Sequence, residues 1–124
     1  MDEQMFKRRT KQLALRVIRL VEALPRKTSG FVIGKQLVRC ATSVGANYRA
    51  ACRAKSRADL IAKLSIVEEE ADECLYWMEL IIEAELMPES KIKSLMAETN
   101  EIVAMTVSSI KTLRHKQNSP KSKI

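Results

Sequence analysis

Five acidic side chains in the middle of the sequence raise the possibility of a metal site. They are Glu68, Glu69, Glu70, Asp72 and Glu73. Helical bundles that bind two metal ions combine carboxylates with Glu-x-x-His pairs on facing helices. Here the only histidine is His115, and Glu22 is the only carboxylate between residues 4 and 58. We therefore predict no metal and no cofactor, and we expect the acidic cluster to pair with basic residues of another helix or subunit.

Nucleophilic catalysis is not indicated either. A serine or cysteine nucleophile needs a base beside it on a structured element, whereas His115 lies next to a polar tail. Cys40, Cys52 and Cys74 are an odd number without a Cys-x-x-Cys pair, which is typical of reduced thiols in a cytosolic protein. We predict that the protein is not an enzyme and that Cys40 and Cys74 fill helix seams.

Basic residues give the strongest functional signal. Residues 4–58 contain fourteen Lys and Arg against one acid, and residues 59–110 contain twelve acids against three lysines. Such segregation is typical of polyanion binding, of subunit pairing, or of both. Because the cations recur at helical spacing, we predict that nucleic acid contacts Arg9, Arg16, Arg19, Lys35, Arg39, Arg49, Arg53, Lys55 and Arg57.

Four helices are predicted to position these residues, and no segment has a strand pattern. Apolar residues recur every three or four positions over residues 6–24, from 29 or 31 to 54, 57–86 and 88–115. Pro25 ends the first helix, Ser29 is a candidate cap of the second, and Ser56 with Asp59 fits a capping box. The fold class is therefore all-α, an antiparallel up-down-up-down four-helix bundle of residues 1–115. We expect residues 116–124 to form a disordered basic tail.

Two of the helices carry a second line of residues beside the core line. The lines contain Cys40, Ser43, Asn47 and Ala50 in one helix and Ile66, Glu70, Glu73 and Trp77 in the other. We assign oligomer contacts or helix packing to Cys40, Ser43, Gly45, Asn47, Ala50, Ile66 and Trp77. Ser43 and Asn47 are expected to hydrogen-bond across a helix interface, with a ligand or RNA contact as the alternative. Tyr76 and Trp77 could stack on bases, but acidic neighbours favour burial at an interface.

The middle of the chain resembles a known family. The segments are Ser43-Val44-Gly45-Ala46-Asn47-Tyr48-Arg49, Arg53-Ala54-Lys55-Ser56-Arg57-Ala58-Asp59-Leu60, Glu70-Ala71-Asp72-Glu73 and Tyr76-Trp77. They resemble the four-helix proteins encoded by intervening sequences in bacterial 23S ribosomal RNA genes, a family that includes the accessory variability protein of diversity-generating retroelements. The resemblance implies a pentameric barrel without enzymatic activity, and in that relative, binding of nucleic acid and of a reverse transcriptase. Many members have a Glu where this chain has Ala50 or Ala51, so no role is transferred for that Glu.

Two functions remain open from the sequence. The first is an oligomeric nucleic-acid-binding adaptor that contacts phosphates without reading sequence, with a reverse transcriptase or another protein as a possible partner. The second is a protein-interaction scaffold whose basic face pairs with acidic surfaces of its own subunits or of a partner. Residues 1–3 do not open a targeting signal, and no apolar run reaches the about 20 residues that span a bilayer. We therefore expect a cytoplasmic protein.

Overall fold

The computed structural model describes residues 2–118, with the side chains of residues 117 and 118 excepted. The elements in chain order are α1 (Glu3–Glu22), α2 (Thr28–Ala51), α3 (Arg57–Glu83), a 3₁₀ turn η1 (Glu89–Lys91) and α4 (Lys93–Asn118). The prediction of an all-α protein with four α-helices and no strand is confirmed over residues 2–118. No described helix is long and apolar enough to cross a membrane.

α1 begins three residues before the predicted start at residue 6. The Asp2 carboxylate accepts hydrogen bonds from the amides of Gln4 (2.9 Å) and Met5 (3.4 Å), and Glu3 adds a negative charge in the first turn. An N-cap oxygen and an early acid both stabilise the positive end of a helix. The helix ends at Glu22, shortly before Pro25.

α2 begins before Ser29, so the prediction that Ser29 caps it is wrong. Lys27 occupies the cap position in an extended conformation, and no side chain makes a capping hydrogen bond there. The helix instead begins with the backbone bond from the Phe31 amide to the Lys27 carbonyl, at 3.0 Å. It ends at Ala51, three residues before the predicted end.

α3 starts where the sequence predicts. Ser56 Oγ accepts the Asp59 amide at 3.0 Å, as in a capping box, but the Asp59 carboxylate accepts the amide of Lys55 rather than that of Ser56. The helix stops at Glu83, before the predicted residue 86, because Glu85 turns left-handed (φ 57°) and the Leu86 amide bonds the Ile81 carbonyl. That pattern is typical of a helix C-terminus.

α4 differs from the prediction at both ends. Residues 89–91 form η1, and only from Lys93 does the chain continue as an α-helix. At the other end the helix continues to Asn118, past the predicted boundary at residue 115. Residues 119–124, the rest of the predicted tail, lie outside the described part of the chain.

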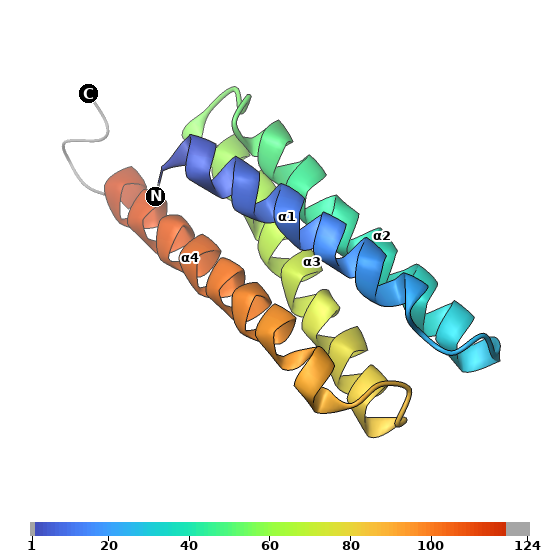
Figure 1. The fold of residues 1–124 in the computed structure, drawn as a ribbon. Helices are drawn as coiled ribbons and strands as arrows, with labels where there is room; N and C mark the ends of the chain where they lie inside the picture. The colour runs from blue at the N-terminus through green and yellow to red at the C-terminus, as the bar shows by residue number, and fades with distance from the viewer. Residues whose placement is uncertain (1, 119–124) are drawn as a thin grey trace.

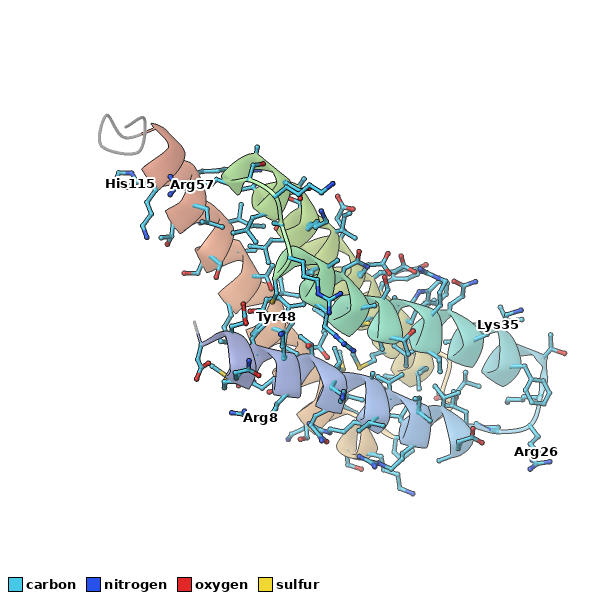
Figure 2. All side chains as sticks on the ribbon, turned by 90° about the horizontal axis from the view of Figure 1, so that it is seen from above. Arg8, Arg26, Lys35, Tyr48, Arg57 and His115 are labelled. Carbon is cyan, nitrogen blue, oxygen red and sulfur yellow. The ribbon has the colours of Figure 1, made fainter. Side chains whose placement is uncertain are left out.

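Short turns join consecutive helices, which lie side by side as elongated rods (Figure 1). Their facing side chains form one core, with fully buried residues from every helix (Figure 2). These include Phe6, Leu13, Val17, Leu37, Val44, Val67, Met78, Ile92 and Ile102. Phe6 and Tyr48 meet edge to face with ring centroids 4.6 Å apart, which ties the start of α1 to the end of α2. The seam between α1 and α4 is the sparsest of the four.

The three glycines differ in how tightly they are packed. A Cβ at Gly30 would lie 2.3 Å from the Pro25 carbonyl oxygen, and one at Gly34 would lie 2.8 Å from Val21 Cγ1. At Gly45 the nearest atom, the Thr10 carbonyl oxygen, is 3.5 Å away, which is an ordinary contact. The closest approach of α1 and α2 is therefore near their connecting turn, whereas Gly45 leaves room for a methyl group.

This difference predicts opposite effects of alanine at two helical positions. Gly45→Ala should raise the free energy of unfolding by up to about 1 kcal/mol, the helix-propensity gain. Gly34→Ala should lower it by about 1–3 kcal/mol, the usual cost of overpacking. Urea unfolding followed by circular dichroism measures both. Equal effects of the two substitutions would show that the helices do not approach more closely at Gly34.

Candidate nucleic-acid interface

A basic groove runs along the outer face of α1 and α2. We call it the α1–α2 groove; it has a volume of about 500 Å³. The residues that line it are Gln4, Lys7, Arg8, Thr10, Lys11, Ala14, Thr42, Gly45, Ala46 and Arg49. Four of these are cations and none is acidic. In Figure 2 Arg8 extends from α1 away from the core.

Small side chains make this face hollow. Ala14 lies on α1, opposite Thr42, Gly45 and Ala46 on α2, so the floor of the groove is formed by atoms close to the two backbones. The Thr42 hydroxyl donates to the Val38 carbonyl at 2.8 Å and thereby turns back onto its own helix. The cations are longer, and they rise on both sides of this floor.

Three of the four cations have no competing partner. Lys7 Nζ lies 3.7 Å from Glu3 Oε2, a loose pair between a partly exposed lysine and an exposed glutamate. Arg8, Lys11 and Arg49 make no ion pair or side-chain hydrogen bond within the described residues, and all three are exposed. Arg49 was among the predicted nucleic-acid-binding residues. The prediction did not include Lys7, Arg8 and Lys11. The sequence signal was present, because Gln4, Arg8 and Lys11 follow helical spacing on one line of α1.

Arg9, predicted to bind nucleic acid, lies on a different side of α1 and contacts α4. Its Nε donates to Glu98 Oε2 at 2.9 Å, and its Nη2 donates to Glu98 Oε1 at 2.7 Å and to Glu101 Oε1 at 3.1 Å. These hydrogen bonds, from Glu98 first, raise the pKa of Arg9 above its ordinary value. Arg16 also faces α4 and donates to Ser94 Oγ at 3.0 Å. The guanidinium of Arg9 is thus already matched to carboxylates.

Arg39 forms a second bridge between the basic and acidic halves of the chain. It donates to Glu70 at 3.2 Å and also pairs with Glu73. Glu73 accepts the Trp77 indole N–H at 3.0 Å as well. That indole bond first, and then Arg39, hold the pKa of Glu73 below its ordinary value. Trp77 is half-buried at the edge of the helical core.

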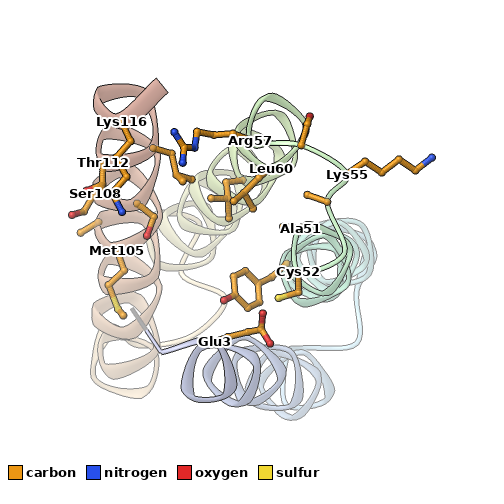
Figure 3. A pocket seen from close by; sticks show the side chains of 17 residues that line it. Glu3, Ala51, Cys52, Lys55, Arg57, Leu60, Met105, Ser108, Thr112 and Lys116 are labelled. Carbon is orange, nitrogen blue, oxygen red and sulfur yellow. The ribbon is translucent and has the colours of Figure 1, made fainter. Parts of the chain in front are cut away.

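The remaining predicted cations are exposed at the two ends of the molecule. Arg19 and Lys35 lie toward the α1–α2 turn, and Arg53, Lys55 and Arg57 lie at the α2–α3 turn. Lys55 and Arg57 line a larger pocket of about 1080 Å³ at that end of the bundle. Figure 3 shows Arg57 reaching from α3 toward α4, whereas Lys55 points outward.

The end pocket suits phosphate less well than the α1–α2 groove. Its walls include the apolar side chains of Leu60, Leu64 and Met105, and the carboxylate of Glu3 lies within it. In the described part of the chain, no three acidic, histidine or cysteine side chains converge to form a metal site.

The predicted packing residues lie in different environments. Cys40 is buried, with its Sγ 3.1 Å from that of Cys74, and this contact and burial raise the pKa of Cys74. Gly45 packs on α1, Ala50 is half-buried, and Ile66 is exposed. Cys40 and Gly45 thus pack between helices of one chain, and contacts of this set with a second copy stay a prediction.

Ser43 and Asn47 differ from the expected pairing across an interface. Asn47 Nδ2 donates to the Ser43 carbonyl oxygen and to Ser43 Oγ, each at 2.8 Å. Both bonds are made one turn apart inside α2. The pair thus satisfies its own polar groups within one helix, and it makes no hydrogen bond to another helix among the described residues.

Comparison with known proteins identifies the family. A family model of the 23S rRNA-intervening sequence protein matches residues 3–108. The chain belongs to this family. It is also similar to a protein with unknown function from the S23 ribosomal protein family of Bacteroides thetaiotaomicron, whose crystal structure was determined at 1.70 Å resolution. The two are 38% identical with a TM-score of 0.83, over 90% of this chain and 99% of the other. No curated protein matches the chain.

The pKa of Glu73 predicts how stability changes in acid. A carboxyl with a depressed pKa stabilises the fold above its unfolded pKa, about 4.3, and loses this contribution as the pH falls through its folded pKa. Glu73→Gln should therefore destabilise the protein at about pH 6 and have a smaller effect at about pH 3. Urea unfolding, followed by the fluorescence of Trp77, measures both values. Glu79→Gln, at an exposed position, is the control, and a pH-independent effect of Glu73→Gln would contradict the assignment.

Proposed function

We propose that the protein is a non-enzymatic adaptor that binds nucleic acid through its phosphate backbone. The α1–α2 groove is the contact surface. The observation that carries the proposal is that Lys7, Arg8, Lys11 and Arg49 line one hollow with no acid among its lining residues. Two other predicted cations, Arg9 and Arg39, are already paired with carboxylates of the same chain.

The spacing of the cations suits one phosphate backbone. Lys7 and Lys11 are one turn apart on α1, which is about 6 Å along the helix. Charges along one strand rise about 3.4 Å per nucleotide, so both lysines can contact the same backbone in a single or a double strand. Arg49 contributes a positive charge from α2 on the opposite wall. Contacts of this kind position the strand and do not read its bases.

We also propose a higher order of assembly in the cytoplasm. The family resemblance supports an up-down-up-down bundle that assembles as a homopentameric barrel, in which each subunit repeats the basic groove. A reverse transcriptase or another protein could then bind the assembly as a partner, and nucleic acid, RNA included, could bind the grooves without sequence preference.

One observation favours the alternative scaffold function. Arg9 and Arg39 show that basic and acidic surfaces of this protein do pair, because each binds two carboxylates of another helix. A scaffold would extend the same pairing to a second molecule. The unpaired cations of the groove would then bind an acidic protein surface rather than phosphate.

Neutralising the groove separates the two functions. Arg8→Gln with Arg49→Gln should weaken binding of a labelled single-stranded oligonucleotide at least tenfold at low salt. Removing two phosphate contacts should also reduce the slope of log K against log salt by about 1.4. Fluorescence anisotropy over a range of salt concentrations measures both quantities for RNA and DNA of unrelated sequence.

A matched control removes two cations that the structure places elsewhere. Lys91→Gln with Lys93→Gln changes the net charge equally at exposed positions, the last residue of η1 and the first of α4, and should alter binding and slope little. Equal losses in both variants would show that only net charge matters. Unchanged binding in the groove variant would refute the groove as the site and leave the scaffold function.

A further inference from the structure

A large pocket at one end of the bundle has no part in the proposed function. It lies where α2 turns into α3, and its walls also include the first turn of α1 and the last turns of α4. Its volume of about 1080 Å³ is close to the upper limit for ligand pockets, about 300–1,000 Å³. The end pocket is therefore large enough for an organic molecule.

Small side chains leave this end of the bundle open. Ala51 and Ala54 line the pocket from the end of α2 and the turn after it, and Ala104 and Ser108 line it from α4. The seam between α1 and α4 is the sparsest of the four, so α1 does not close the gap. Because none of these short side chains reaches across, space remains between the helix ends.

Aliphatic side chains form the inner part of the end pocket. Leu64 is buried in the core, and Leu60, Met105 and Leu113 are partly buried and pack against that core. An alkyl chain placed against them would remove apolar surface from water, which is favourable in proportion to the area buried.

One wall of the end pocket combines cations with hydroxyl groups. Ser108, Thr112 and Lys116 follow one another at intervals of four residues, which places them on one line of α4. Arg57 reaches from α3 toward this line, whereas Lys55 points outward (Figure 3). Two cations and two hydroxyls from two helices thus border the aliphatic part on the same side.

These polar groups are available to a ligand. Thr106, one turn before the line on α4, donates its hydroxyl to the Ile102 carbonyl at 2.7 Å. The hydroxyls of Ser108 and Thr112 make no hydrogen bond within the described residues. Arg57 and Lys116 likewise make no ion pair or side-chain hydrogen bond there.

The charge of the end pocket is asymmetric. Glu3 is the only acid among its lining residues, and Figure 3 shows it at α1, on the opposite side from Arg57 and Lys116. A negative group is attracted to the cations and repelled by the carboxylate. An anionic ligand would therefore place its charged end at α3 and α4, with its apolar part against the leucines.

We propose that the end pocket binds an alkyl chain that ends in one anionic group, a carboxylate or a phosphate. Arg57 and Lys116 bind the anionic group, the hydroxyls of Ser108 and Thr112 donate to it, and Leu60, Leu64 and Leu113 hold the chain. This inference goes beyond the proposed function, because the end pocket and the α1–α2 groove share no lining residue.

Calorimetric titration with dodecanoate and with dodecyl phosphate, each below its micelle concentration, tests the site. At least one of them should bind saturably with one molecule per chain, and the tighter of the two identifies the preferred anionic group. Dodecyltrimethylammonium has the same chain with a positive group and should bind about tenfold more weakly or worse. Circular dichroism checks that the protein stays helical in each ligand.

Two variants examine the two halves of the site. Arg57→Gln with Lys116→Gln changes exposed residues and should weaken binding of the anionic ligand by about tenfold or more, since it removes two charged partners. Ser108→Trp keeps the net charge and places a large side chain at the pocket wall, so it should weaken binding by at least as much.

Matched controls exclude an effect of net charge alone. Lys91→Gln with Lys93→Gln also removes two positive charges, outside the end pocket, and should bind the ligand as the wild type does. The groove variant, Arg8→Gln with Arg49→Gln, should do the same, which separates this site from nucleic-acid binding.

Four results would overturn the inference. They are no saturable binding of either anionic ligand, equal binding of the cationic one, unchanged binding in the Ser108→Trp variant, and equal losses in the pocket and control variants. Loss of oligonucleotide binding in the groove variant with no ligand binding to the wild type would leave the proposed function intact and reject only the end pocket.

Discussion

Pairing between the basic and acidic halves of the chain determines which charges remain available. Arg9 binds Glu98 and Glu101 of α4, and Arg39 binds Glu70 and Glu73 of α3. The Arg9 contact is the more important for the fold, since the seam between α1 and α4 is sparse and this side chain is only a quarter exposed. Exposed pairs such as Arg39–Glu70 contribute about 0–1 kcal/mol, so their main effect is to orient the helices and neutralise charge. On the outer face of α1 and α2, by contrast, Arg8, Lys11 and Arg49 have no such partner among the described residues.

Apolar periodicity was enough to predict the core. On α3 the predicted core line starts at half-buried Leu60, and all its other members are buried: Leu64, Val67, Ala71, Cys74, Met78 and Ile81. A repeat of three and four positions permits only one inward face on a helix. Helix ends were harder to predict. Asp2 begins α1 through its own cap, whereas α2 starts at Thr28 without any capping side chain, so no residue type marked its first turn.

The binding residues could be predicted only in part, because a sequence shows charge without its partner. Arg9 and Arg8 are neighbours of the same type, yet the 100° rotation between successive helical residues sends Arg9 to the carboxylates of α4 and Arg8 to the open groove. Which acid lies opposite depends on the pairing of helices far apart in the chain. The same limit applies to Asn47, whose amide could reach another helix but bonds Ser43 within its own.

Taken alone, one groove offers few contacts. Three cations without partners correspond to a modest, strongly salt-dependent attraction for phosphate. A single subunit would therefore hold a strand weakly. Linking several grooves makes each further contact intramolecular, which raises the overall affinity by about 10²–10⁴ without any new side chain when the geometry allows simultaneous binding. The proposed homopentameric assembly would provide that linkage by repeating Lys7, Arg8, Lys11 and Arg49 in each subunit. The segregation of charge has two consequences within one chain: Arg9 and Arg39 pair with carboxylates of other helices, whereas the α1–α2 groove keeps cations with no acid among its lining residues.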